Sequence, residues 1–182
     1  EGARIHRVER GAVVADRALR IAVDGRELVG HPTGVGRYLF EILRAWADDP
    51  AMRHDIIVIL PASPPPHLAA LGSKLAWRVE PAAKPGTWWE QMRLPRVLAR
   101  LAPDVFFAPG YTAPLQHCCP TVVTIHDVSF WAHPEGFRRR ERLRRRWLTR
   151  TTARRAARIL TVSEFSAREL ALWLRVNPDR ID

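Results

Sequence analysis

Two pairs of polar side chains each follow a short β-branched run in the second half of the chain. The pairs are His126 with Asp127 and Ser163 with Glu164. An imidazole can donate a hydrogen bond to a sugar hydroxyl or a phosphate oxygen, and a neighbouring carboxylate can accept one from a hydroxyl. Parallel strands of an open α/β sheet deliver such groups to one crevice beyond their carboxyl ends. The two pairs therefore predict a ligand site rather than a structural surface.

Both pairs also have a structural interpretation. His126 can be satisfied by backbone groups, and the sequence does not separate this role from ligand binding. Ser163 is interpreted mainly as the N-cap of a helix, and Glu164 complements the dipole of its first turn. Glu164 can also accept a hydroxyl at the entrance of the crevice. No Ser/His/Asp triad and no nucleophilic cysteine arrangement fits these spacings.

A glycine-containing loop precedes a predicted helix near the start of the chain. Residues 30–38 read Gly-His-Pro-Thr-Gly-Val-Gly-Arg-Tyr, and Asp24 and Arg26 lie shortly before them. The free N–H groups and positive dipole end of a helix N-terminus favour an anion such as phosphate. The loop lacks the third glycine of a dinucleotide fingerprint and the Gly-Lys-Ser/Thr of a P-loop. It is therefore either a packing device or a phosphate contact.

Alternating strand and helix signals position these groups. β-Branched runs predict strands, and apolar residues at helical spacing predict helices, with Thr33 as N-cap of the first long helix. This order predicts an α/β fold, with a Rossmann-like, open, mostly parallel sheet and helices on both faces. Residues 109–120 are barely long enough for a parallel crossover. The predicted strands are 21–24, 56–60, 75–79, 104–108, 122–125 and 158–162, and the predicted helices are 35–47, 67–71, 89–101, 137–157 and 164–174.

Length and composition fit one globular domain. The chain has 182 residues, 47% of them hydrophobic, and we expect a loose leader over residues 1–19 and one domain over residues 20–182. It opens on Glu1 and stops at what reads as the start of a strand, so we expect it to be cut from a longer protein. The absence of a membrane-spanning stretch and of a secretory signal predicts a cytoplasmic location. Cys118 and Cys119 are adjacent, which predicts neither a disulfide nor a metal site.

Positive charge is concentrated in one predicted helix. The net charge is +10, and residues 136–158 alone contain eleven arginines and one glutamate. This helix can be a solvated surface, a contact with anionic lipid headgroups at the inner face of the plasma membrane, or a nucleic-acid contact. It lacks a nucleic-acid recognition motif, so no nucleic-acid partner is expected. The predicted membrane-facing stripe consists of Arg142, Arg146, Arg150 and Arg154. The predicted packing face consists of Leu143, Trp147, Leu148 and Thr151.

Four ordered segments carry a resemblance to a known family. They are Asp24-Gly-Arg26, Thr33-Gly34-Val-Gly36-Arg37-Tyr38, His126-Asp127-Val-Ser-Phe and Arg158-Ile-Leu-Thr-Val-Ser163-Glu164-Phe-Ser166. Over about residues 20–182 the chain resembles the N-terminal domain of retaining glycosyltransferase family 4 enzymes with the GT-B fold. It is similar in particular to bacterial members that transfer mannose or similar hexoses in building cell-surface polysaccharides.

The resemblance implies an activity for the whole enzyme. It implies transfer of a hexose, with retention, from a nucleotide-diphosphate sugar to a glycan or lipid-linked acceptor, without a metal ion or another cofactor. The donor would be held mainly by a C-terminal domain that this chain lacks, so we expect the chain to fold but not to transfer sugar. A non-catalytic binding protein with the same fold and a basic nucleic-acid-binding module are the alternatives.

The same resemblance implies roles for individual residues. His126 is expected to approach the transferred sugar, with Asp127 beside it as the second catalytic residue. The expected donor-binding residues are Gly34, Gly36, Asp24 and Arg26. Further contacts with donor or acceptor are expected from Thr33, Arg37, Ser163 and Glu164. Front-face attack assisted by the donor phosphate needs no protein nucleophile, and positive groups and helix ends would stabilise the leaving diphosphate.

Overall fold

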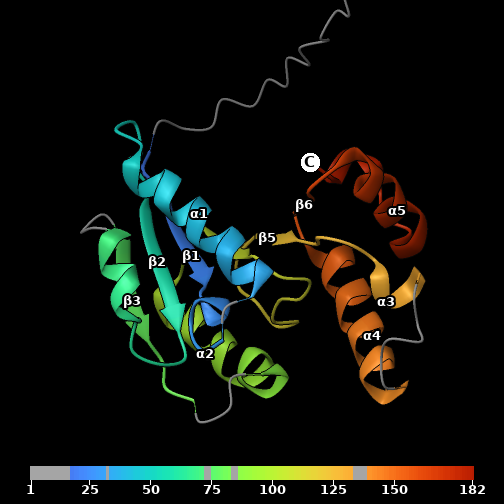
Figure 1. The fold of residues 1–182 in the computed structure, drawn as a ribbon, viewed down its shortest axis with the longest axis horizontal. Coiled ribbons are helices and arrows are strands. Elements are labelled where there is room, and N and C mark those ends of the chain that lie inside the picture. The colour runs from blue at the N-terminus through green and yellow to red at the C-terminus, as the bar shows by residue number, and fades with distance from the viewer. Residues whose placement is uncertain (1–16, 32, 72–74, 83–85, 133–138) are drawn as a thin grey trace, which may run out of the picture.

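An open sheet of six parallel strands lies between two layers of helices (Figure 1). The structure, a computed structural model, describes residues 17–31, 33–71, 75–82, 86–132 and 139–182. The strand order is β3-β2-β1-β4-β5-β6, which confirms the predicted α/β, Rossmann-like fold. The strands are β1 (Arg20–Asp24), β2 (Asp55–Leu60), β3 (Leu75–Val79), β4 (Val105–Ala108), β5 (Thr121–Thr124) and β6 (Arg158–Leu160).

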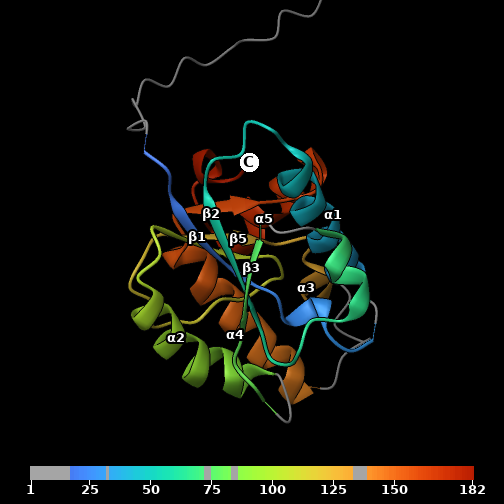
Figure 2. The same ribbon diagram turned by 90° about the vertical axis from the view of Figure 1, so that its left-hand side faces the viewer.

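Helices cover both faces of the sheet. Residues of α1 and η2 pack on one face, and residues of α2, α4 and α5 pack on the other. Figure 2 shows α1 and α2 on opposite sides of the strands. The helices are α1 (Gly34–Asp48), α2 (Leu94–Leu101), α3 (Ser129–Ala132), α4 (Arg139–Arg155) and α5 (Glu164–Leu174). Shorter turns are η1 (Arg26–Leu28), η2 (Pro66–Leu71), η5 (Pro178–Arg180) and the π-helical η3 (Trp89–Arg93), which continues directly into α2.

The two faces of the sheet have separate apolar cores. In β1, Ala22 faces the core on the α2 side and Val23 the core on the α1 side, and neither is exposed. A parallel sheet covered on both faces is buried throughout, so its strands read as continuous apolar runs. This explains why the strand positions could be predicted from β-branched runs. It also means that Asp24, at the carboxyl end of β1, is anchored by a rigid strand.

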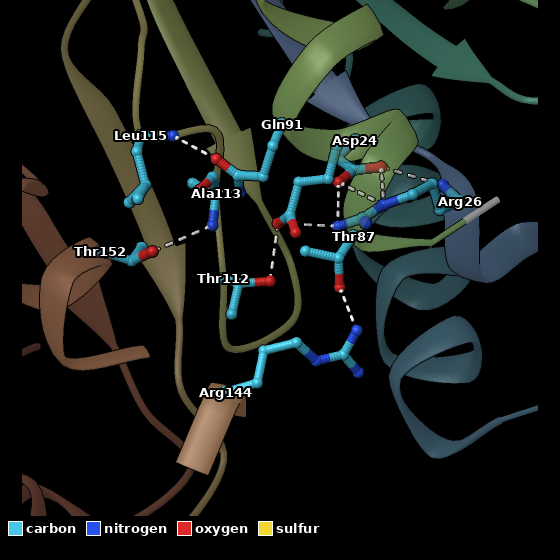
Figure 3. A network of polar contacts seen from close by, with 10 residues as sticks. Asp24, Arg26, Thr87, Gln91, Thr112, Ala113, Leu115, Arg144 and Thr152 are labelled. Atoms are coloured by element: carbon cyan, nitrogen blue, oxygen red, sulfur yellow. Dashed lines mark hydrogen bonds and ion pairs between the residues drawn. The ribbon is translucent and has the colours of Figure 1, made fainter. Parts of the chain in front are cut away.

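The connection from β4 to β5 is a parallel crossover without a helix. The two strands pair in parallel, and neither a helix nor a strand occurs in residues 109–120 between them. The amide side chain of Gln91 anchors this loop: its Nε2 donates to the carbonyl oxygen of Ala113 at 3.2 Å, and its Oε1 accepts from the backbone N–H of Leu115 at 3.0 Å (Figure 3). Residues 109–120, which the sequence indicates are barely long enough, therefore suffice for the parallel crossover.

The ends of the described chain join the sheet. The carbonyl oxygen of Leu19 accepts a hydrogen bond from the N–H of Asp55 at 2.8 Å. At the other end, Ile181 forms a parallel bridge with Ile159 of β6, in agreement with the predicted start of a strand. The predicted leader lies outside the described residues except for its last three positions.

The sheet-facing side of α4 differs from the predicted one. Leu143 and Trp147, which were expected to pack, are 54% and 60% exposed. Threonine and alanine side chains instead face the sheet, because small side chains let the helix approach it closely. The spacing of apolar residues does not reveal this kind of contact. The predicted start of this helix at Phe137 lies outside the described residues. The buried residues of α4 are Leu148, Thr149, Thr152 and Ala153.

Candidate functional site

The candidate site lies where the order of the strands reverses. β1 leads through α1 to β2 on one side, whereas β4 lies on its other side and leads to β5 and β6. The carboxyl ends of strands border a crevice at such a switch point. Asp24 ends β1 and Gly110 follows β4 at this edge. A Cβ atom on Gly110 would lie 3.1 Å from Cγ1 of Val35, so the loop after β4 also approaches the start of α1.

Asp24 and Arg26 form a buried ion-pair network with Glu90. Figure 3 shows Arg26 against Asp24. Nε of Arg26 donates to both carboxylate oxygens of Asp24, at 3.1 and 2.9 Å. Its Nη2 lies 3.1 Å from Oε1 of Glu90, which also accepts the hydroxyl of Thr112 at 2.6 Å. Both acids are 2% exposed. Two buried carboxylates thus share one guanidinium, which connects β1, η3 and the β4–β5 loop.

Arg26 is held in its charged form by this network. Burial disfavours the charge, but the charges and hydrogen bonds of Asp24 and Glu90 outweigh it and keep the pKa of Arg26 above its ordinary value. The guanidinium carbon also lies 5.7 Å from the ring centroid of Trp89. Nη1 makes no hydrogen bond to any described residue. The network therefore fixes Arg26 in place and leaves one of its nitrogens for a ligand.

His126 is tied to the end of β4. Its Nε2 lies 2.9 Å from the carbonyl oxygen of Pro109, and because a carbonyl oxygen only accepts, Nε2 carries a proton. The ring packs edge-on against Tyr38 of α1, with 4.8 Å between centroids, and lies 5.6 Å from the ring of Tyr111. A backbone group therefore satisfies Nε2, whereas Nδ1 has no hydrogen-bond partner among the described residues.

Asp127 is oriented by two hydrogen-bond donors. The Tyr111 hydroxyl donates to Oδ2 and the Ser129 backbone N–H to Oδ1, each at 2.8 Å. Partial burial opposes ionisation, but these bonds and the neighbouring His126 lower the pKa of Asp127 below its ordinary value. Burial and the bond to Asp127 raise the pKa of Tyr111 well above its ordinary value. At neutral pH Asp127 is therefore ionised and Tyr111 is neutral.

Tyr111 has a left-handed backbone conformation. Its φ is 55°, which costs a residue with a bulky side chain about 1–2 kcal/mol. Its N–H donates to the carbonyl oxygen of Thr124 at 2.8 Å, and this bond holds the conformation. One side chain thereby contacts both His126 and Asp127. Strain retained at such a position is typical of a functional site.

The glycine loop combines helix packing with an open surface. Thr33 caps α1 as predicted, because its hydroxyl accepts from the N–H of Gly36 at 2.9 Å, and it also donates to Glu27 at 2.9 Å. A side chain on Gly36 would clash with the carbonyl oxygen of Glu27, whereas no atom of the described residues lies within 4 Å of a Cβ atom on Gly34. A cavity of about 290 Å³ borders the loop and is lined in part by Thr33, Gly36 and Arg37. Gly36 therefore serves packing, and Gly34 leaves space for a ligand.

Ser163 and Glu164 lie at the start of α5. The hydroxyl of Ser163 accepts from the N–H of Ser166 at 3.1 Å, which confirms the predicted helix cap. Glu164 is exposed in the first turn. In the described part of the chain no hydrogen bond or ion pair joins either residue to His126 or Asp127. A ligand contact by Glu164 stays a prediction.

The four arginines predicted to face a membrane do not form one exposed stripe. Arg146 donates to the Trp131 carbonyl oxygen at 3.3 Å, and Arg150 donates to a carbonyl oxygen of α5 at 2.9 Å. Their guanidinium carbons lie 5.9 and 6.0 Å from the ring centroid of Trp131. Arg142 is also half-buried, and only Arg154 of the four is exposed. Arg146 and Arg150 are turned toward the protein because this side of α4 packs against α3 and α5.

A polar cleft of about 210 Å³ lies beside the Arg26 network. Its walls come from η1, the residues around the start of η3, the β4–β5 loop and α4. Arg144 of α4 reaches across it and donates to the Thr87 hydroxyl at 2.9 Å (Figure 3). Thr149 also lines the cleft, is fully buried, and its hydroxyl has no partner among the described residues. Tyr111 belongs to the same lining, so the cleft adjoins His126 and Asp127.

Several residues of the site are absent from the sequence-based prediction. Only Glu90 could have been recognised from the sequence. It directly follows Trp89 at the start of a predicted helix, and both residues are buried. An acid on the buried face of a helix requires a partner. The others are ordinary loop and helix residues whose proximity depends on tertiary structure. They are Tyr111, Thr112, Arg144 and Thr149.

The comparison with protein families decides the classification. The model of the family described as Glycosyltransferase Family 4 matches residues 32–182, most of the chain. The chain belongs to glycosyltransferase family 4. The match contains residues 32–38 of the glycine loop, His126 with Asp127, and Ser163 with Glu164. A search of curated protein sequences gives no match for this family-4 domain.

Solved structures share the fold of this family-4 domain. Two crystal structures of Anabaena HepE, one with UDP and glucose and one with UDP, each match with a TM-score of 0.57 at 18% identity, covering 90% of this chain and 43% of theirs. A glycosyltransferase from Rickettsia africae ESF-5 matches with a TM-score of 0.52 at 9% identity, covering 92% of this chain and 42% of its own. The family-4 domain therefore spans less than half the length of these structures.

Two further features of the described ranges concern membranes and metals. None of their helices combines the length and apolar character needed to cross a bilayer. Within the same ranges, His, Cys, Asp and Glu side chains do not gather in threes that could hold a metal ion. Metal independence and membrane contact both stay predictions.

Proposed function

We propose that this family-4 domain forms the acceptor side of a GT-B glycosyltransferase that moves a hexose from a nucleotide-diphosphate sugar to a glycan or lipid-linked acceptor. The family match over residues 32–182 carries the proposal. The UDP and glucose bound in HepE support a nucleotide sugar as the donor. The resemblance in sequence supports a narrower form, transfer of mannose or a similar hexose in cytoplasmic steps of surface-polysaccharide assembly.

The start of α1 supports a contact with the donor. Gly34 is the first residue of α1 and has open space around it, and Arg37 lines the adjacent cavity. The N–H groups and dipole at a helix N-terminus attract negative charge. We place the diphosphate or the sugar of the donor at this side, with most donor contacts supplied by a second domain.

His126 and Asp127 are proposed to act on the transferred hexose. Because Nε2 of His126 donates to Pro109, Nδ1 is the ring nitrogen left to accept a hydrogen bond from a hexose hydroxyl. The ionised Asp127 adds negative charge beside the ring, where positive charge develops on a glycosyl group in the transition state. The arrangement favours electrostatic stabilisation over nucleophilic attack by the protein.

Retention is proposed to proceed by front-face attack. The bond from the hexose C1 to the diphosphate oxygen breaks, and an acceptor hydroxyl oxygen bonds to C1 on the same face. The hydroxyl proton passes to the departing phosphate oxygen, so no protein nucleophile takes part. Positive groups and helix ends stabilise the leaving diphosphate, and we propose that no metal ion is needed.

The exposed side of α4 supports an anionic lipid surface as a further partner. Leu143 and Trp147 are exposed there beside exposed Arg139 and Arg140, and Arg154 is exposed at the end of the helix. Tryptophan beside arginine suits the interface of an anionic bilayer. We expect flotation with phosphatidylglycerol vesicles but not with neutral vesicles, and a loss of recovery in Trp147→Ser. Equal recovery with both vesicles would contradict the proposal.

The anomeric configuration of the product tests the retaining reaction. Protein expressed from the coding frame read past Asp182 is incubated with α-linked UDP-hexoses and GDP-hexoses and a lipid extract as acceptor. We expect an α-linked product with one of these donors, identified by its anomeric NMR coupling. A β-linked product would contradict retention and leave hexose transfer in place.

A further inference from the structure

The cleft beside Arg26 contains a buried hydroxyl that the described residues leave without a hydrogen-bond partner. This hydroxyl belongs to Thr149, whose side chain is not exposed at all. An unpaired buried hydroxyl is costly, so its persistence calls for a ligand or a water. Glu90 lines the same cleft with only Oε1 engaged by described residues, which leaves Oε2 to accept a hydrogen bond. Groups of this kind suit a ligand that carries hydroxyls.

The same cleft contains Arg144, which has no carboxylate partner in the part of the chain that the structure describes. Arg144 donates to the neutral hydroxyl of Thr87, and no acid among the described residues lies within ion-pair distance of it. The other two arginines of the cleft differ in this respect, since Arg26 pairs with Asp24 and Glu90, and Arg145 pairs with Glu141. A guanidinium that is free of carboxylates favours phosphate, whose oxygens match its planar donors. Nη1 of Arg26, which donates to no described residue, is a further donor in the same cleft.

We propose that this cleft binds a hexose phosphate unit of the acceptor, with Arg144 and Nη1 of Arg26 on the phosphate and Glu90 and Thr149 on sugar hydroxyls. The inference rests on the proposed function and names the class of its acceptor. The volume of about 210 Å³ lies below that of ordinary ligand pockets, which is about 300–1,000 Å³, and suits a single sugar unit. The phosphate comes either from a soluble sugar phosphate or from the headgroup of a lipid-linked acceptor.

Binding of hexose 1-phosphate to the 182-residue chain tests the proposal. We expect glucose 1-phosphate or mannose 1-phosphate to shift the amide NMR signals of Thr87, Thr112 and Thr149, and free hexose to bind at least about tenfold more weakly. Arg144→Gln should reduce the affinity for the sugar phosphate about tenfold. Arg139→Gln, on the same helix and with the same loss of charge, should change it less than about twofold. Equal affinity for hexose 1-phosphate and free hexose would overturn the proposal. Equal effects of Arg144→Gln and Arg139→Gln would overturn it as well.

A second variant separates binding from folding. Thr149→Val removes the unpaired hydroxyl and keeps the shape of the side chain. The free chain should denature at a higher temperature, because a buried unsatisfied group is lost, while its affinity for hexose 1-phosphate should fall at least about threefold. A merely structural threonine would change stability without changing affinity, and that result would overturn its role in binding.

A lipid-linked probe identifies the source of the phosphate. Farnesyl phosphohexose in detergent micelles is compared with soluble hexose 1-phosphate. Tighter binding of the lipid probe, with the same response to Arg144→Gln, assigns the site to a lipid-linked acceptor, and equal binding assigns it to a soluble one. Failure of both probes refutes the inference. The binding experiments contain no nucleotide sugar, so their failure would not count against the proposed transfer reaction. If the sugar phosphate binds but no hexose is transferred, the transfer reaction is contradicted and the binding site is not.

Discussion

Nε2 of His126 donates a hydrogen bond to the carbonyl oxygen of Pro109 at 2.9 Å and thereby joins the end of β5 to the end of β4. His126→Phe keeps a ring between Tyr38 and Tyr111 but leaves the carbonyl without its donor. We expect the free energy of unfolding to fall by about 1–3 kcal/mol in chemical denaturation. His67→Phe, at an exposed position, serves as the control and should be nearly neutral. An unchanged stability of His126→Phe would show that the bond is dispensable.

Gly36 and Gly34 predict opposite responses to the same substitution. A Cβ atom on Gly36 clashes with the backbone of Glu27, and one on Gly34 meets no described residue within 4 Å. Gly36→Ala should therefore lower the free energy of unfolding by more than about 2 kcal/mol, because a backbone contact must open. Gly34→Ala should stay within about 0.5 kcal/mol of the parent chain. Similar unfolding curves for the two variants would contradict the packing of α1 on η1.

Arg26 is expected to be the most sensitive charged residue of the fold. Arg26→Met leaves Asp24 and Glu90 buried without a counter-charge, which should cost about 3–5 kcal/mol in the free energy of unfolding. Arg44→Met removes an exposed pair with Glu41 (arginine side chain 58% exposed) and should cost less than about 1 kcal/mol. Thermal denaturation of both variants measures the difference. Equal costs would mean that the network is not buried in solution.

Asp127 predicts a stability difference that depends on pH. Its folded pKa lies below that of an unfolded aspartate, about 3.9. The resulting stabilisation is present above the unfolded pKa and is lost as the pH falls through the folded pKa. The melting temperature of the parent chain should exceed that of Asp127→Asn at pH 6, and the difference should shrink below about pH 4. Tyr111→Phe removes one donor and should weaken this trend, and a difference that stays constant down to pH 2 would contradict it.

The adjacent cysteines should differ in reactivity. Burial, together with the neighbouring Cys118, raises the pKa of Cys119 to about 12, whereas Cys118 is exposed. Because the thiolate is the reactive form, an alkylating reagent at pH 8 should label one thiol in the native chain and two in denaturant. Peptide mapping by mass spectrometry identifies the labelled residue. Rapid native labelling of Cys119 would contradict its burial.

The arrangement of strands could be predicted because burial leaves a direct mark on the sequence. β1 and β2 are covered on both faces, so they are apolar runs with clear ends. The N-caps Thr33 and Ser163 were equally predictable, since a cap depends on residues within three positions. The α/β fold and the carboxyl-edge position of His126 rest on these local signals.

The contacts within the site could not be predicted in the same way. Arg26 meets Glu90 across 64 positions, and Tyr38 meets His126 across the interface between α1 and β5. Nothing local marks such pairs. The buried side of α4 was mispredicted because apolar spacing selected Trp147, whereas close approach to the sheet selects threonine and alanine. Arg146 and Arg150 then turn toward Trp131.

A side-by-side measurement of hexose transfer tests the central claim most directly. It compares the purified 182-residue chain with the protein expressed from the coding frame read past Asp182. Both are incubated with the same panel of UDP-hexoses and GDP-hexoses and the same lipid extract, and the release of nucleoside diphosphate that depends on the extract is recorded. The account predicts turnover by the longer protein and none by the chain alone. Turnover by the chain alone, or none by the longer protein with any donor, would contradict it.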